Sequence, residues 1–190
     1  MNMTIAKSNG FSLIEVLFAI FIFAVGLLGI AGLQLFAKQN NFDAVQRTSA
    51  ALLVNEIAEK IRANPESAAL YVSSVTDLAN ATLPPAVCTK TTACTSDNLA
   101  AFDLRNWYEA ILGVSEQSSG GNSIGGLVSP SACISSVTNA AGEVVGYDIA
   151  IAWRGKAAMT NPTSSTCGED PDVYGTDNVY RRVIVFSIAV

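Results

Sequence analysis

The chain is built around one stretch near its start: Gly10-Phe11-Ser12-Leu13-Ile14-Glu15-Val16-Leu17-Phe18-Ala19-Ile20. It opens an apolar run that continues almost to Phe36, in which the clearly polar side chains are Ser12, Glu15 and Gln34. A run of this length and composition has the dimensions of a membrane span. Glu15 lies inside it, and because an ionisable group in a membrane segment is costly, we interpret this glutamate as functional.

The ten residues before Phe11 have the character of a short leader, with Lys7 as their basic residue. A secretory signal peptide would have a shorter apolar core followed by a small-residue cleavage site, and this run shows neither. A plain signal anchor, with Lys7 holding the N-terminus inside, explains the hydrophobicity and the topology. It explains neither Glu15 nor the glycine directly before Phe11.

Composition narrows the classes of function. The 190 residues carry a net charge of −5 and no histidine. Histidine-dependent catalysis and histidine metal sites are therefore excluded, and the acidic balance argues against nucleic acid as a partner. The sequence contains no G-x-S-x-G nucleophile motif and no phosphate-binding glycine loop. We expect a protein that is not an enzyme and that binds no cofactor.

Four cysteines, Cys88, Cys94, Cys133 and Cys167, all follow the apolar run. If that region lies across the membrane in an oxidising compartment, two disulfides are the natural interpretation. Three pairings are possible, and the sequence alone does not choose between them. The short spacing of Cys88 and Cys94 suggests a local loop, which leaves Cys133 with Cys167. A zinc site is the rival interpretation, although close CxxC pairs and histidine are missing.

Apolar periodicity continues beyond the membrane-length segment and predicts one long helix from near Phe11 to near Ala63. Asn64-Pro65 ends it, because the residue before a proline avoids helical backbone angles. We expect residues 11–35 to form the transmembrane or fibre-core half, 36–64 the amphipathic half, and 65–190 the globular part. The predicted buried face consists of Phe42, Val45, Ser49, Leu52, Leu53, Ile57 and Ile61.

The remainder predicts a second helix and an antiparallel sheet. Residues 73–95 resemble a loop. Thr95-Ser96-Asp97 then offers a cap for a helix that ends near Gly113, with Trp107 as a packing anchor. Strands are predicted at 132–138, 144–154 and 179–190, with the last one inside the sheet because it is so apolar. The fold class is therefore α+β, a long N-terminal helix packed on an antiparallel sheet.

The acidic residues before the last strand could suggest calcium, but a solvated loop is the better interpretation and no metal site is expected. They are Glu169, Asp170, Asp172 and Asp177. Arg181 and Arg182 are adjacent in a strand, so they face opposite sides. We expect one of them to pair with the acidic loop at the surface, where such a contact contributes little.

The segment Gly10-Phe11-Ser12-Leu13-Ile14-Glu15 resembles the class III signal of type IV pilins and type II secretion pseudopilins. The resemblance implies that prepilin peptidase cleaves after Gly10 and that the new first residue, Phe11, is N-methylated. It also implies that Glu15 pairs with the N-terminal amine of a neighbouring subunit during fibre assembly. One carboxylate meeting one ammonium in a low dielectric would set the axial register, because the unpaired state is expensive.

Within that family the chain resembles the PilV-like minor pilins, also called type IV pilus modification proteins. The similar segments are Phe102–Trp107 after Cys94, Tyr147–Trp153 and Arg181–Val185. This implies a minor pilin that primes pilus assembly in a tip complex and supports adhesion and twitching motility. Its partners would be other minor pilins, the major pilin, prepilin peptidase, the inner membrane and the pilus assembly platform.

Two alternatives remain open at this point. One is a minor pseudopilin of a type II secretion system, which shares the signal and the architecture. The other is a signal-anchored periplasmic enzyme or binding protein, which would keep an intact N-terminus and tolerate changes at Glu15.

Overall fold

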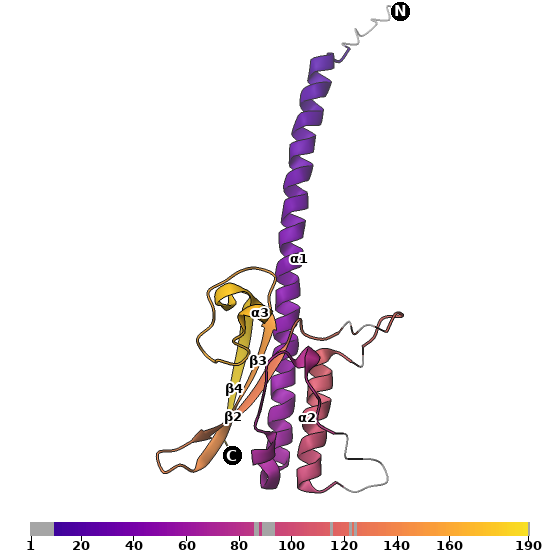
Figure 1. Ribbon diagram of the computed structural model, residues 1–190. Helices are drawn as coiled ribbons and strands as arrows, with labels where there is room; N and C mark the ends of the chain where they lie inside the picture. Colours follow the sequence, from indigo (N-terminus) through magenta and orange to yellow (C-terminus); the bar gives the residue numbers. More distant parts are fainter. Residues whose placement is uncertain are drawn as a thin grey trace, which may run out of the picture. The chain divides into compact units, whose positions relative to one another are not determined.

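The computed structural model describes residues 10–85, 88, 94–114, 116–121, 123 and 125–189. The expected leader lies outside these residues except for Gly10. The helices and strands, in order, are α1 (Leu13–Ala63), η1 (Pro65–Tyr71), β1 (Ser73–Val75), η2 (Leu78–Asn80), α2 (Ser96–Leu112), β2 (Ser131–Thr138), β3 (Val144–Arg154), α3 (Pro171–Tyr174), η3 (Thr176–Asn178) and β4 (Arg181–Ala189) (Figure 1). The predicted α+β class, with a long N-terminal helix and an antiparallel sheet, is confirmed.

Contacts divide the chain into two units, one up to Phe42 and one from Asp43 to Val190. In the first unit α1 is bare, since every residue from Gly10 to Asn41 is exposed. In the second unit the same helix supplies part of the core. The buried residues there are Gln46, Ala50, Val54, Ile57, Ala58 and Ile61.

The predicted face of α1 is wrong at two positions, because Val45 and Leu52 are 53% and 67% exposed. Gln46 is buried in their place. Its side-chain amide donates to the Gly126 carbonyl at 3.3 Å, and its amide oxygen accepts from the Val128 N–H at 3.0 Å. These bonds satisfy a polar side chain that periodicity alone assigns to the surface.

Helix α2 begins and ends where its capping residues predict. Thr95 Oγ1 accepts from the Asn98 N–H at 3.2 Å, and Gly113 closes the helix at a φ of +66°, which favours glycine. Figure 1 shows α2 alongside the C-terminal part of α1. The fully buried Trp107 joins the two helices, because its indole Nε1 donates to the Leu53 carbonyl at 2.8 Å.

The sheet has the order β1-β2-β3-β4, with each neighbouring pair antiparallel. Two predictions about it are wrong. Residues 73–75 form the edge strand β1 rather than a loop, because they pair with residues 132–134 of β2. The apolar β4 lies at the other edge rather than inside the sheet. Partial burial of its side chains on both faces, rather than a second neighbouring strand, explains its composition.

Both faces of the middle of the sheet are covered. The face toward the helices buries alternating residues of β3, namely Tyr147, Ile149, Ile151 and Trp153, whereas Val145 is 40% exposed. On the opposite face Ala150 and Ala152 are also buried. The segment between β3 and β4, residues 155–180, covers that face, since Cys167 is bonded to Cys133 and the Tyr174 hydroxyl lies 2.9 Å from that of Ser131.

Candidate processing and assembly site

The N-terminus of α1 brings Gly10, Phe11 and Glu15 into one short segment. The Ser12 carbonyl accepts from the N–H groups of Glu15 at 3.0 Å and Val16 at 3.3 Å, which starts the helix. Phe11 is 83% exposed, and no other part of the structure lies within 4 Å of where a Gly10 side chain would be. The bond between Gly10 and Phe11 therefore precedes the helix and stands clear of the rest of the described chain.

Glu15 lies in the first turn of α1, where a negative charge is favoured by the helix dipole. Its carboxylate makes no hydrogen bond or ion pair with any residue that the structure describes. Phe11, Ala19 and Phe23 lie along the same side of the helix. Among the residues that the structure describes, the glutamate is thus an unpaired acid on an apolar surface.

By length and composition α1 could cross a membrane. Its most apolar 18-residue window has a mean hydropathy of 2.8, and none of that window is buried within the protein. Exposed apolar surface of this extent marks a membrane or protein contact. The helix therefore fits a membrane-anchored state and a state in which other subunits cover it.

The structure contains two disulfides, in the pairs Cys88–Cys94 and Cys133–Cys167. Their Cα atoms lie 5.5 Å and 5.8 Å apart, within the usual range for a disulfide. The first closes a local loop before α2. The second attaches residues 155–180 to β2.

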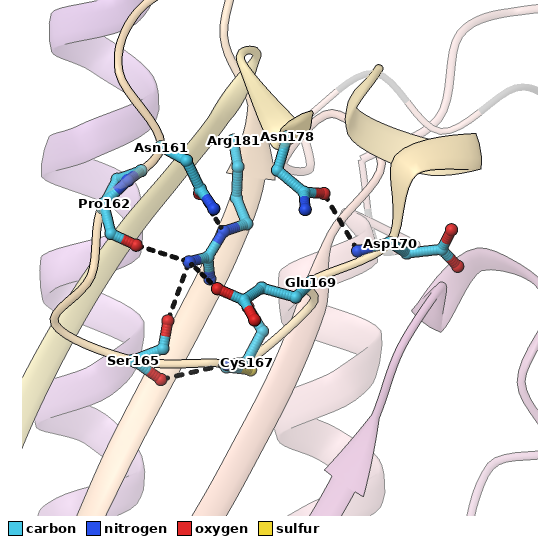
Figure 2. Close-up of polar contacts among 8 residues, drawn as sticks. All are labelled: Asn161, Pro162, Ser165, Cys167, Glu169, Asp170, Asn178 and Arg181. Atoms are coloured by element: carbon cyan, nitrogen blue, oxygen red, sulfur yellow. Dashed lines mark hydrogen bonds and ion pairs between the residues drawn. The ribbon is translucent and has the colours of Figure 1, made fainter. Parts of the chain in front are cut away.

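A buried arginine organises that covering segment, and this role was not predicted (Figure 2). The Arg181 side chain is fully buried rather than at the surface. Its guanidinium donates to the carbonyls of Cys167 (2.6 Å), Pro162 (2.6 Å) and Ser165 (2.8 Å) and to Asn161 Oδ1 (2.9 Å). The Glu169 carboxylate lies 3.2 Å away. One of the two arginines therefore does pair with the acidic loop, as expected. The expected surface position is wrong, because the Arg181 side chain is buried under the covering segment.

Burial lowers the pKa of the Arg181 guanidinium from its usual value, while Glu169 and Tyr174 act in the opposite direction. Arginine stays protonated at physiological pH even with such a shift. Alternation along a strand predicts that Arg181 and Arg182 face opposite sides. It does not reveal which of the two lies beneath covering backbone.

Asp170, one of the acidic residues of the segment, is used in local structure. Asp170 Oδ1 accepts from the Asp172 N–H at 2.9 Å and starts α3, and Asn178 Oδ1 accepts from the Asp170 N–H at 3.0 Å. Within the described ranges, no group of three or more histidine, cysteine, aspartate or glutamate residues is arranged to hold a metal ion.

Comparison with known proteins gives two family matches. Residues 5–31 match the prokaryotic N-terminal methylation motif, and residues 32–105 match the family described as type IV pilin Tt1218. No curated protein and no solved structure matches the chain. The first match contains Gly10, Phe11 and Glu15, and the second runs from the middle of α1 into α2. Together with the long helix and the antiparallel sheet, these matches show that the chain is a type IV pilin.

Proposed function

We propose that this pilin is a minor subunit that primes pilus assembly, within a complex of minor pilins at the pilus tip, and supports adhesion and twitching motility. Before assembly it is held in the inner membrane by a single span, with residues 65–190 in the periplasm. Prepilin peptidase cleaves after Gly10 and the amine of Phe11 is methylated. The chain then joins other minor pilins and the major pilin through the assembly platform.

The unpaired Glu15 is the observation that supports this proposal most directly. Its carboxylate has no partner among the described residues, and the helix around it is bare and apolar. An ammonium group from a neighbouring subunit would neutralise the acid once it leaves water, where an unpaired charge is expensive. Cleavage before Phe11 creates such an ammonium in every processed subunit.

Mass spectrometry of the protein purified from its own membranes tests the processing step. The mature chain is expected to begin with N-methylated Phe11. A chain that still begins with Met1, or one cut inside the apolar run, would refute both the cleavage and the role of the new amine.

Substitution tests the role of Glu15. Glu15→Ala and Glu15→Gln should remain in the membrane but be depleted from sheared pili, since neither retains a negative charge. Gln34→Ala, a polar-to-apolar change in the same segment, is the matched control and should assemble normally. Normal assembly of both Glu15 variants would remove the role given to this carboxylate.

The cell fraction in which the wild-type chain is found separates a pilus subunit from a type II secretion pseudopilin and from an anchored periplasmic protein. A pilus subunit is recovered with sheared pili, whereas a type II secretion pseudopilin is needed for export of secreted proteins and not for piliation. An anchored enzyme or binding protein keeps its original N-terminus and tolerates both Glu15 substitutions.

A further inference from the structure

A surface cavity of about 320 Å³ lies in the second unit, away from the N-terminal segment. We call it the α1–sheet socket. It is lined by Asp43, Ala44, Arg47, Trp153, Met159 and Arg182. These residues come from α1, the end of β3, the segment that follows β3, and the start of β4. The socket therefore lies on the surface where α1 meets the sheet.

The socket carries an excess of positive charge. Arg47 is exposed and makes no hydrogen bond or ion pair with the residues that the structure describes. The Arg182 guanidinium donates to the carbonyls of Arg181 and Ala157, and Asp43 Oδ1 accepts from the Lys156 N–H at 3.4 Å. Two arginines and one aspartate thus line the socket, in a chain whose net charge is −5.

Trp153 supplies a second, independent observation. Its side chain is 3% exposed, and its indole Nε1 is the buried side-chain donor that has no hydrogen-bond partner within the described ranges. The other tryptophan, Trp107, donates to the Leu53 carbonyl. Buried polar groups are nearly always satisfied, and leaving one unpaired is costly. The lining of the socket therefore includes a residue with a buried donor that has no partner within the described ranges.

We propose that the socket receives a carboxylate side chain of a neighbouring pilin subunit. A carboxylate accepts hydrogen bonds from guanidinium groups with matching geometry, and it offers an oxygen to the indole N–H. Met159 is 57% exposed and, with the exposed Ala44, gives the rim an apolar part that suits a protein surface better than a small free anion.

The position in the chain identifies the source as another subunit. Asp43 and Arg47 directly follow the bare part of α1, which other subunits must cover in a fibre. This inference rests on the proposed assembly with other pilins and adds the chemistry of one contact.

Carbodiimide crosslinking of the full-length chain in sheared pili, or in the membrane complex of pilins, tests the contact. Arg47→Lys keeps the positive charge and introduces an amine. The reagent activates a carboxylate, the amine displaces the reagent as a urea, and an amide bond links the two chains. Thr48→Lys places the same amine on the neighbouring exposed position of α1, which does not line the socket.

The expected result is an intermolecular crosslink from Arg47→Lys to an aspartate or glutamate of another pilin, identified from the linked peptides. Its yield should exceed that of Thr48→Lys by on the order of tenfold, since the reagent joins only groups in contact. Equal yields would overturn the proposal, as would the absence of a crosslink in a chain that is present in the complex. If the wild-type chain is absent from pili and pilin complexes, the proposed function is wrong, and so is the proposed contact at the socket, which depends on it.

A second measurement tests the hydrogen-bond donors of Arg47 and Trp153 by the amount of each variant in sheared pili. Arg47→Gln and Trp153→Phe should each reduce the amount of the chain in sheared pili by on the order of tenfold, because each removes a hydrogen bond to a charged group. Arg62→Gln removes an equal charge from an exposed ion pair with Glu59 and should change that amount by less than about twofold. Equal effects of Trp153→Phe on the amount in pili and on the total amount of folded protein would show a packing defect, and would contradict the role of the indole donor.

Discussion

At the scale of single residues, Arg181 holds together the segment that covers the sheet. It donates hydrogen bonds to three backbone carbonyls and to the Asn161 side chain, and it forms an ion pair with Glu169. Arg181→Ala leaves these buried acceptors unpaired, so we expect the free energy of unfolding to fall by about 3–5 kcal/mol. Urea unfolding of the detergent-solubilised chain, followed by near-UV circular dichroism, measures this loss. Arg62→Ala, at an exposed ion pair, should cost less than about 1 kcal/mol, and equal losses would contradict the assignment.

Buried tyrosines should make the protein sensitive to alkali. Burial raises the pKa of Tyr71, Tyr108 and Tyr174, the last to about 12. An unfolded tyrosine ionises near pH 10, so these residues favour the unfolded chain above that pH. The free energy of unfolding should therefore be insensitive to them below about pH 10 and fall as the pH rises toward 12.

Tyr174→Phe isolates one contribution to that decline. The variant loses the hydrogen bonds to Ser129 and Ser131 at every pH, but it should lose on the order of 2 kcal/mol less than the wild type between pH 9 and pH 12. Urea midpoints measured across this range give the comparison. Parallel pH profiles for the two proteins would contradict the prediction.

Some contacts of single residues could not be predicted from sequence patterns. Periodicity identifies a buried face of α1 that includes Ile57 and Ile61, but not the burial of Gln46, because its two partners lie 80 and 82 residues further along the chain. Arg181 is a similar case. Three of its acceptors are backbone carbonyls, which leave no trace in the side-chain pattern.

At the scale of elements, the two disulfides should differ in their contribution to stability. Cys133 and Cys167 are 34 residues apart in sequence, whereas Cys88 and Cys94 are 6 apart. A longer closed loop removes more entropy from the unfolded chain, which gives about 4 kcal/mol for the first bond and about 2 kcal/mol for the second. Paired serine substitutions, compared by urea unfolding, test this order. A larger loss for Cys88–Cys94 would contradict it.

Elements with strong local signals could be predicted from the sequence. The structure gives β3 the predicted bounds, and α2 lies between its predicted caps. The strand β1 has three residues, two of them serine, so its place depends on pairing with β2 rather than on its own composition. The edge position of β4 was missed because the covering segment buries its apolar side chains in part, as a neighbouring strand would.

At the scale of the whole molecule, the hydrophobic core belongs to the second unit alone. Its buried residues run from Ala50 to Ile188, and none comes from the bare part of α1. A chain that begins at Asp43 should therefore fold without detergent, form both disulfides and unfold cooperatively. Circular dichroism, thermal unfolding and a non-reducing peptide map test this expectation. Aggregation or loss of cooperative unfolding would show that the first unit is needed for the core.

The sequence predicted the overall organisation better than it predicted the surface. The apolar run and the glutamate within it indicate a functional membrane-length segment, because an ionisable group there is costly. The socket beside Trp153 arises where four segments meet, so no local pattern could have indicated it.

The edge position of β4 affects how the protein behaves at high concentration. From Val183 to Ala189 this strand contains no lysine and no proline, the residues that usually protect an exposed edge from pairing with another chain. It is therefore the part of the folded unit most prone to seed intermolecular sheets when subunits accumulate unassembled. Val185→Lys should slow aggregation of the concentrated protein, measured by light scattering, and an unchanged rate would place the seed elsewhere. Storage in the membrane at low density, before assembly, would limit such encounters.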